Sequence, residues 1–364
     1  MIKTSLLALC LACLALAATA AEKNAVAWHD ASNWKPVGRA WDDTPAPFSR
    51  LPARAQKSVP KSVWLRSLKS AGLYFDFKTD ATVIQTRIEL TDPVIPKKHS
   101  AASASGLDLY ARDPSGTWRW AGVVFPSDQK STDTILSGAI PGLREYRLYL
   151  PPFNTIKTIE IGVPTSCRLE QSPLPTAKPI VYYGTSIIHG YAASRPGMSV
   201  TALLGRKLNR PVINLGFSGV GKMEPAVVDL VAEIDAAVFV IDCLPNMSSL
   251  TPPEIIERAE NGLRVLRARH PKTPIILLED RTYANSWIKP SQLRKNSEAR
   301  AALRVVRDKL ARENFPGLTY LQGEGLFGDD DDATVDGSHP TDLGIARFVE
   351  RLLPLLRSAL AKSN

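Results

Sequence analysis

Residues 179–187 read Pro-Ile-Val-Tyr-Tyr-Gly-Thr-Ser-Ile and decide the fold of the C-terminal half of the chain. A short apolar run is followed at once by a Gly-Thr-Ser turn, which is typical of a buried parallel strand that leads into a helix. Three similar runs follow at residues 212–215, 236–243 and 274–278, and amphipathic segments separate them. The segment that starts at residue 251 carries a capping box with proline at its first helical position. This alternation predicts an α/β domain with a parallel sheet covered by helices on both faces.

The preceding half of the chain has a different pattern. Residues 84–90, 146–150 and 158–161 alternate apolar and polar side chains with a period of two. Turn sequences such as Asp113-Pro114-Ser115-Gly116 separate the alternating segments, and we see no helical period between them. The pattern predicts half-buried antiparallel strands in an all-β sandwich of the jelly-roll kind.

These patterns divide the chain into four parts. We expect a signal peptide over residues 1–20, a β-sandwich accessory domain over 25–170, a proline-rich linker over 171–179 and a catalytic α/β domain over 180–364. The candidate functional groups described below all fall in the last part.

The N-terminus has the pattern of an export signal. Lys3 precedes an apolar run over residues 6–17, and Ala18-Thr19-Ala20 is a small-x-small cleavage site. The run is shorter than the ~20 apolar residues of a spanning helix, so stable membrane insertion is not expected, although a membrane anchor is the alternative. We therefore predict export to the periplasm or the extracellular space. Export permits a disulfide between Cys167 and Cys243, but the apolar run around Cys243 favours a buried thiol.

The composition and the distribution of charge bear on the partners of the protein. The 364 residues include 45 Lys and Arg and 36 Asp and Glu, which gives a formal net charge of +9. The basic residues do not cluster and no nucleic-acid motif is present, so a nucleic-acid partner is not expected. A mildly basic surface could attract acidic glycans, although solubility alone explains it as well. The sequence leaves the oligomeric state open.

Four polar groups follow the predicted strands or precede the last helix. They are Ser186, the glycine-rich loop 216–221, Asn246 and the pair Asp336 and His339. Because ligands of parallel sheets bind at the carboxyl ends of the strands, these groups should meet. Each alone has a structural alternative as a helix cap, a flexible loop or a turn. Together they indicate a serine nucleophile with a histidine base and an orienting carboxylate.

The same residues resemble the SGNH hydrolase superfamily, the GDSL-type esterases. Gly184-Thr185-Ser186-Ile187 is similar to the nucleophile block, with Thr for the usual Asp and Ile for Leu. Gly219 matches the glycine of the second block. Asn246 matches the asparagine of the third, although its usual Gly-x-Asn-Asp context is Leu-Pro-Asn-Met here. The last block matches Asp336 and His339, and the resemblance covers residues 178–360.

A second resemblance lies in the N-terminal half. Gly106-Leu107-Asp108-Leu109-Tyr110 is similar to the Gly-x-Asp-Leu-Tyr signature of a β domain that precedes some bacterial SGNH hydrolases. Residues 193–198, Ala-Ser-Arg-Pro-Gly-Met, are similar to the catalytic domains paired with it.

The resemblance implies a role for each group. Ser186 would be the nucleophile, His339 the general base and Asp336 the group that orients His339. The backbone N–H groups of Ser186 and Gly219, with the Asn246 side chain, would form the oxyanion hole. This mechanism needs no cofactor and no metal.

Other residues are weaker candidates. His339 is the only one of the five histidines with a carboxylate three residues away. His189, Tyr191, Arg195 and Trp287 are candidates for substrate binding, with packing or solvent exposure as the alternative for each. Residues 279–281 favour an internal ion pair over a place in the cleft, and the acidic run 329–332 favours a solvated loop over a Ca²⁺ site.

The function predicted from these patterns is that of a secreted serine esterase. Its partner would be an acylated carbohydrate or another small ester. The polar, glycine-rich loops of the predicted cleft favour acetyl as the acyl group. Two alternatives remain open: a catalytically degenerate glycan-binding protein, and an acyltransferase that uses the same triad.

Overall fold

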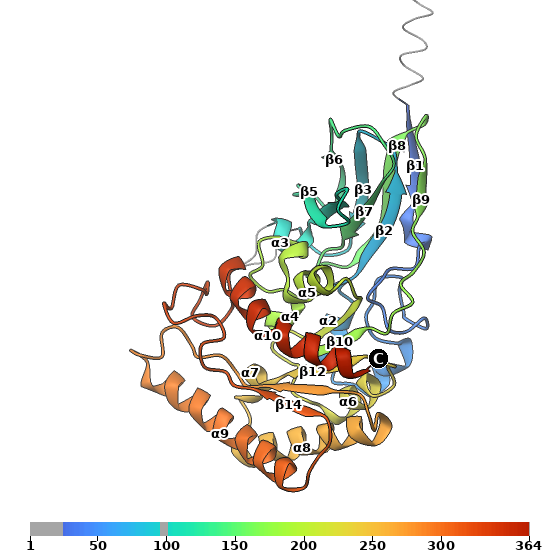
Figure 1. Ribbon diagram of the computed structural model, residues 1–364. Coiled ribbons are helices and arrows are strands. Elements are labelled where there is room, and N and C mark those ends of the chain that lie inside the picture. The colour runs from blue at the N-terminus through green and yellow to red at the C-terminus, as the bar shows by residue number, and fades with distance from the viewer. Residues whose placement is uncertain (1–24, 95–100, 364) are drawn as a thin grey trace, which may run out of the picture.

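A computed structural model describes residues 25–94 and 101–363. A β domain sits on an α/β domain, and the C-terminal helix runs along the α/β domain (Figure 1). The signal peptide expected over residues 1–20 lies outside the described residues. In the described ranges, no helix is long and apolar enough to cross a membrane.

The β domain is a sandwich of two antiparallel sheets, as predicted. One sheet has the order β1-β8-β3-β6 and the other β5-β4-β7-β2-β9. Their inner faces enclose a core that includes Phe75, Leu109 and Ile161. The strands are β1 (Val26–Asp30), β2 (Tyr74–Thr79), β3 (Ile84–Leu90), β4 (Leu107–Arg112), β5 (Trp118–Val124), β6 (Lys130–Leu136), β7 (Arg144–Tyr149), β8 (Ile156–Pro164) and β9 (Leu169–Gln171).

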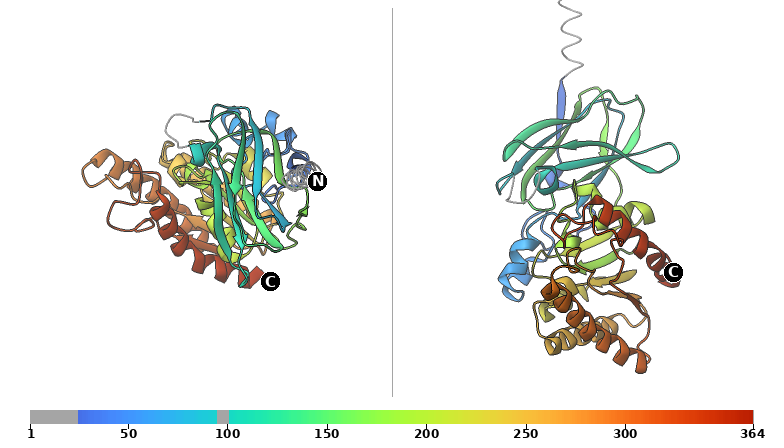
Figure 2. Two further views of the ribbon diagram at one scale, coloured as in Figure 1. Left: turned by 90° about the horizontal axis from the view of Figure 1, so that it is seen from above. Right: turned by 90° about the vertical axis from the view of Figure 1, so that its left-hand side faces the viewer.

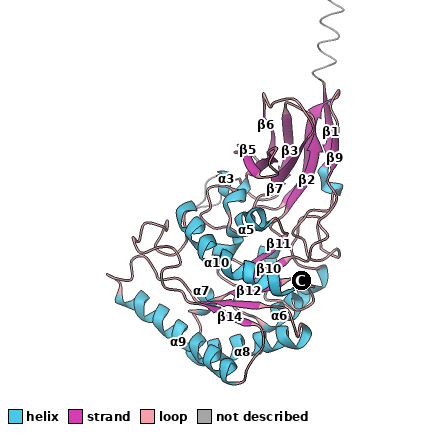
Figure 3. Ribbon diagram, in the orientation of Figure 1, coloured by secondary structure: helices cyan, strands magenta, loops and turns pink. Residues whose placement is uncertain are grey.

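The α/β domain has three layers, which confirms the predicted α/β/α architecture. Its parallel sheet has the order β11-β10-β12-β13-β14 and comprises β10 (Ile180–Gly184), β11 (Val212–Gly216), β12 (Val238–Asp242), β13 (Ile275–Leu278) and β14 (Leu318–Leu321). The helices are α4 (Ser186–His189), α5 (Val200–Leu208), α6 (Pro225–Val231), α7 (Leu244–Met247), α8 (Pro252–Arg269), α9 (Pro290–Arg312) and α10 (Asp342–Ser363). One face packs against α6, α8 and α9, and the other against α5 and α10 (Figure 3).

The central strands are mostly apolar because both faces of this sheet are covered. Every residue of β10, β11 and β12 is buried. Their register aligns the ends of the strands, since Gly184 lies opposite Gly216 on one side and Asp242 on the other. The chain therefore leaves three neighbouring strands at one level of the carboxyl edge.

The segment between β1 and β2 is not part of either sheet of the sandwich. It contains two short 3₁₀ turns, Ala31–Asn33 and Ala53–Lys57, and the helix α2 (Lys61–Ser67). Another short helix, α3 (Ala101–Ser105), precedes β4. Trp41, Leu51 and Trp64 are buried in the core of the α/β domain, and the segment lies against that domain (Figure 2).

This crossing segment corrects the expectation of an accessory half made of strands alone. Most of the buried apolar side chains of the segment, among them Trp41, Leu51 and Trp64, pack in the core of the α/β domain, whereas Phe48 packs in the core of the sandwich. The period-two pattern could not reveal it because the segment has too little regular structure.

The signature Gly106–Tyr110 lies where the two domains meet. Leu107 and Leu109 face the sandwich core, whereas Asp108 and Tyr110 point to the turn 195–197 of the α/β domain. Asp108 accepts hydrogen bonds from Arg195 Nη1 at 2.7 Å and from the Gly197 N–H at 2.8 Å, and Arg195 Nη1 also donates to the Tyr110 hydroxyl at 2.6 Å. A Cβ on Gly197 would lie 2.5 Å from the Asp108 carboxylate, so only glycine fits there. The signature therefore docks the domains.

We expect Trp64→Ala to destabilise the whole protein although Trp64 lies between two sandwich strands in the sequence. Its side chain is buried in the α/β core, and truncating a buried Trp costs about 3–5 kcal/mol. Leu65→Ala is the matched control, because Leu65 is the next residue of α2 and is 48% exposed. Its free energy of unfolding in urea should change by no more than about 0.5 kcal/mol. Equal losses in both variants would show that the segment does not complete the α/β core.

We expect Asp108→Ala to weaken the domain interface. The carboxylate is fully buried, and its removal leaves the Arg195 guanidinium and the Gly197 N–H without this acceptor. Breaking a buried pair costs about 3–5 kcal/mol, and the partial exposure of Arg195 favours the lower value. The measurement is the urea midpoint, with Glu170→Ala on the exposed edge of β9 as control. A midpoint equal to that of the control would refute the docking role.

Candidate active site

Ser186 stands on a tight turn between β10 and α4. The strand ends at Gly184, and Ser186 is the first residue of the four-residue helix. A Cβ on Gly184 would lie 2.7 Å from the Ile188 side chain, so glycine allows the turn to close. Because the first N–H groups of a helix have no intrahelical acceptor, the Ser186 N–H is free of the helix ladder.

The structure brings Ser186, His339 and Asp336 together in one hydrogen-bonded row. Ser186 Oγ lies 2.8 Å from His339 Nε2, and His339 Nδ1 lies 2.8 Å from Asp336 Oδ2. The ionised carboxylate can only accept, so Nδ1 carries a proton and Nε2 is left to accept one from Ser186. The imidazole is therefore held in the tautomer that a general base requires.

Asp336 is built to remain ionised. Partial burial opposes its charge, but the N–H groups of His339 and Ser338 donate to Oδ1 at 2.9 and 3.0 Å. Together with the His339 ring they lower the pKa of Asp336 below its ordinary value. The hydrogen bonds within this tight turn thus fix both the charge and the position of the carboxylate.

Arg281 holds the same turn from outside. Its guanidinium donates to the Ser338 carbonyl at 3.0 Å and to the Ser338 hydroxyl, and it pairs with the buried Asp280. The neighbouring Glu279 pairs with Arg304 at 2.6 Å. These contacts confirm internal ion pairs at residues 279–281. Sequence reasoning did not connect Arg281 with His339, and its only signal was its position after a predicted strand.

The glycine-rich loop after β11 wraps around the end of β10. Phe217 N–H donates to the Gly184 carbonyl at 3.0 Å, and a Cβ on Gly221 would lie 2.1 Å from that oxygen. Gly219 has a φ of +72°, which glycine adopts without strain. The Asn246 amide nitrogen lies 3.3 Å from the carbonyl oxygens of both Phe217 and Gly221. The structure thus brings Gly219 and Asn246 together, with the Asn246 amide tying the loop.

His189 is inside the protein and faces away from solvent. Its Nε2 donates to the Pro152 carbonyl at 2.8 Å, and its ring stacks on Phe153 at 4.3 Å. Its Nδ1 is 3.4 Å from the Ser218 N–H, which donates to it. Burial first, and then the nearby charge of Arg50, hold the pKa of His189 well below its usual value. A neutral His189 therefore links the β domain to the glycine-rich loop.

The three remaining candidates lie in different surroundings. The Tyr191 ring lies 4.1 Å from the His339 ring, so Tyr191 belongs to the neighbourhood of the triad. Trp287 is 76% exposed and follows a loop whose Ala284 N–H donates to the Gly337 carbonyl beside the triad. Arg195 is engaged by Asp108 and Tyr110 in the domain interface.

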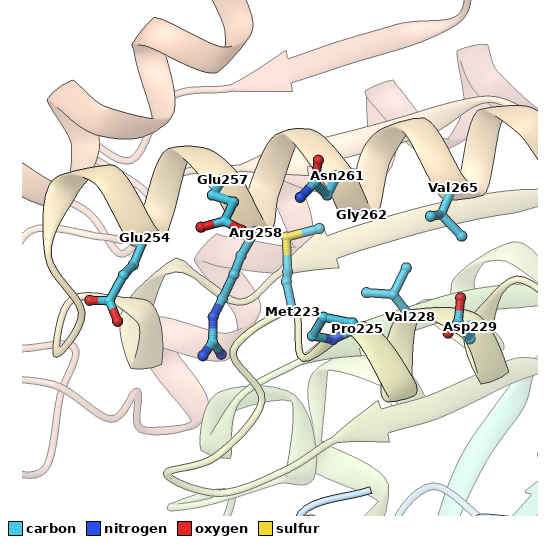
Figure 4. A pocket seen from close by; sticks show the side chains of 10 residues that line it. All are labelled: Met223, Pro225, Val228, Asp229, Glu254, Glu257, Arg258, Asn261, Gly262 and Val265. Carbon is cyan, nitrogen blue, oxygen red and sulfur yellow. The ribbon is translucent and has the colours of Figure 1, made fainter. Parts of the chain in front are cut away.

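A pocket of about 270 Å³ lies between α6 and α8, apart from the triad (Figure 4). It contains carboxylates and one guanidinium but no serine, histidine or cysteine. Its lining residues are Met223, Pro225, Val228, Asp229, Glu254, Glu257, Arg258, Asn261, Gly262 and Val265. The hydrogen-bonded serine, histidine and aspartate are therefore at the sheet edge and not in this pocket.

The described residues offer neither a metal site nor a disulfide. Over residues 25–94 and 101–363, no group of three or more His, Cys, Asp or Glu side chains could hold a metal ion. In the acidic run, Asp330 pairs with Arg347 at 2.7 Å. Cys167 and Cys243 do not pair, and Cys243 is buried, as expected from its apolar surroundings.

Comparison with known proteins agrees with this geometry. A model of the GDSL-like lipase/acylhydrolase family matches residues 177–357, and a model of the N-terminus of SGNH-hydrolase-type esterases matches residues 26–169. A solved structure from Bacteroides ovatus, described as a GDSL-like lipase, is 31% identical with a TM-score of 0.88. The alignment covers 93% of this chain and 98% of that one. A search of curated proteins finds no match.

Two more distant structures share the fold alone. The salicylyl-acyltransferase SsfX3 of a tetracycline biosynthetic pathway is 18% identical, with a TM-score of 0.74 over 92% of this chain and 97% of that one. A family two carbohydrate esterase from Clostridium thermocellum, solved with cellohexaose, is 14% identical. Its TM-score is 0.59 over 80% of this chain and 94% of that one.

Proposed function

Because the chain belongs to the GDSL-like lipase/acylhydrolase family, we propose that it is an exported serine esterase that removes short acyl groups, chiefly acetyl, from carbohydrate. The observation that carries the proposal is the hydrogen-bonded row from Ser186 through His339 to Asp336. A protein that only binds glycan has no need of a base held in a single tautomer, so this row favours catalysis over binding.

The proposed reaction has two halves. Ser186 Oγ attacks the ester carbonyl while its proton passes to His339 Nε2. The tetrahedral intermediate collapses, the bond to the alcohol breaks, and His339 returns the proton to the leaving oxygen. Water then attacks the acyl-enzyme with His339 again as base, and Ser186 leaves with a proton. Asp336 stays ionised and stabilises the charged imidazole in both halves.

The proposed oxyanion hole combines backbone and side-chain donors. The N–H groups of Ser186 and Gly219 supply two donors at the edge of the sheet. Asn246 would be the third, which requires its amide to leave one of the two carbonyl groups that it bonds here. Removing one donor of this kind typically lowers turnover ~10²–10³-fold.

Surface chemistry supports carbohydrate as the substrate class. Trp287 offers an exposed ring close to the triad turn, and such rings can stack on sugars. The loops 216–222 and 245–249 are rich in Gly, Ser and Asn, and a broad apolar surface for a long acyl chain would need different residues. The esterase solved with cellohexaose shows that this fold can receive a glycan. Export rests on the pattern of residues 1–20.

Acyl transfer is the second candidate, because it uses the same first half-reaction and differs only in the acceptor. The salicylyl-acyltransferase shares the fold, so architecture does not separate the two reactions. Free acetate from an acetylated glycan would indicate hydrolysis, and acetyl groups on an added sugar acceptor would indicate transfer.

We expect Ser186→Ala and His339→Ala each to abolish ester hydrolysis without unfolding the protein. The double variant should lose no more than the single ones, because the nucleophile and its base act as one unit. The assay is turnover of p-nitrophenyl acetate, with circular dichroism as the folding control. Near-wild-type turnover in purified Ser186→Ala would remove the serine from the mechanism.

We expect activity to fall steeply from p-nitrophenyl acetate through butyrate to octanoate. The polar loops around Ser186 suit a small acyl group, and a long chain would lie against Gly, Ser and Asn side chains with little apolar surface to cover it. An acetylated polysaccharide should release acetate in parallel. Faster turnover of octanoate than of acetate would favour a lipolytic function of the same triad.

A further inference from the structure

The glycine-rich loop is held by two arginines from the segment between β1 and β2. Arg66 of α2 donates from Nε to the Ser218 carbonyl. Arg50 donates from Nη1 to the carbonyls of Asn214 and Gly216, at 3.0 and 2.8 Å. The loop that carries Gly219 is therefore fastened by groups that lie about 150 residues away in the sequence.

The backbone donors of this loop can be counted one by one. Their acceptors are Asn214 Oδ1 for Gly216, the Gly184 carbonyl for Phe217, His189 Nδ1 for Ser218, and the Phe217 carbonyl for both Val220 and Gly221. Of the N–H groups over residues 216–221, all of which the structure describes, only that of Gly219 has no acceptor. Gly219 is exposed, so this N–H is open to solvent and available to a ligand.

The peptide between Ser218 and Gly219 couples this donor to Arg66. The described residues contain no cis peptide bond, and in a trans peptide the carbonyl and the N–H point in opposite directions. Fixing the Ser218 carbonyl on Arg66 therefore points the Gly219 N–H away from α2. The guanidinium charge also draws electron density from the carbonyl, which makes the N–H at the other end a stronger donor.

Arg66 has no carboxylate partner to share its charge in the part of the chain that the structure describes. Its second contact is with the Ser62 carbonyl of its own helix, at 3.1 Å. A half-buried cation that binds only carbonyl groups lowers the stability of the folded state. The orientation of the loop can offset this loss. The arrangement favours a functional role over a simple ion pair.

We propose that Arg66 is a positioning residue that sets the direction and the donor strength of the Gly219 N–H in the oxyanion hole. The proposal rests on the proposed esterase function. It goes beyond that function because it gives a residue of the N-terminal half a part in orienting the oxyanion hole. Arg66 itself does not touch substrate and acts only through the Ser218–Gly219 peptide.

The test compares Arg66→Met, Arg66→Lys and the wild type, with Arg54→Met as control. Arg54 lies on the exposed side of the same segment, where it pairs with Asp43 and Glu233. Turnover and KM are measured with p-nitrophenyl acetate. The affinity for phenylboronic acid is measured as well, because Ser186 Oγ adds to boron and places a boron-bound oxygen in the hole.

Arg66→Met should lower kcat about 10–10²-fold, which does not exceed the decrease that follows removal of a whole donor. It should change KM less than about twofold. The affinity for the boronate should fall by a similar factor. Arg66→Lys keeps the charge and one donor, so its kcat should lie between those of Arg66→Met and the wild type. Arg54→Met should match the wild type in all three quantities.

Several outcomes would overturn the proposal. They are a kcat of Arg66→Met within about twofold of the wild type, a loss confined to KM, and an unchanged affinity for the boronate. If Arg66→Met fails to fold, Arg66→Lys decides by the same three quantities. A wild type without activity on any ester refutes the proposed function instead, so the two failures can be told apart.

Discussion

The rest of the structure depends on hydrogen-bond partners for the backbone groups at the carboxyl ends of β10 and β11. Arg50 donates hydrogen bonds to two carbonyl groups at the end of β11, those of Asn214 and Gly216. It also donates to two carbonyl groups of the crossing segment, those of Lys69 and Arg66. No carboxylate takes part, and burial lowers the pKa of Arg50 to about 9. A buried cation of this kind is tolerated only when all these acceptors are in place. The end of β11 and the crossing segment therefore have to fold together.

The same solution recurs at both loops of the candidate site. Arg66 fixes the Ser218 carbonyl beside Gly219, and Arg281 fixes the Ser338 carbonyl beside His339. The planar guanidinium, with several donors in a rigid arrangement, suits this task better than an ammonium group. Arg281 has the charge of Asp280 next to it, so the triad turn is held by a neutralised pair. The glycine-rich loop is held by two arginines without a carboxylate partner among the described residues, together with the neutral Asn246 and His189. The arginines leave a positive field beside the proposed oxyanion hole.

The sequence predicted what depends on local pattern and on the alignment of parallel strands. Period-two alternation and buried runs predicted both domains, and the Asp336-x-x-His339 spacing closes a hydrogen bond within one turn. It did not predict contacts between distant segments without periodicity, such as Arg50 on Gly216. His189 lies three residues after Ser186, and Arg195 lies in the segment 193–198 that carries the second resemblance. Their surroundings are set by Pro152 and Asp108 of the other domain, which no local pattern could reveal.

The docking contact of Asp108 has a consequence for the history of such proteins. Its carboxylate needs both the Arg195 guanidinium and a glycine at position 197, so the five-residue signature and the turn 195–197 form two halves of one joint. The signature also serves the sandwich, because Leu107 and Leu109 lie in its core and Asp108 Oδ1 accepts from Trp120 Nε1 at 3.1 Å. The turn lies outside the parallel sheet, and a change of Arg195 or Gly197 removes a partner of Asp108. Selection therefore acts on the two halves together. A chain in which the two domains had been exchanged for others should have lost both halves at once.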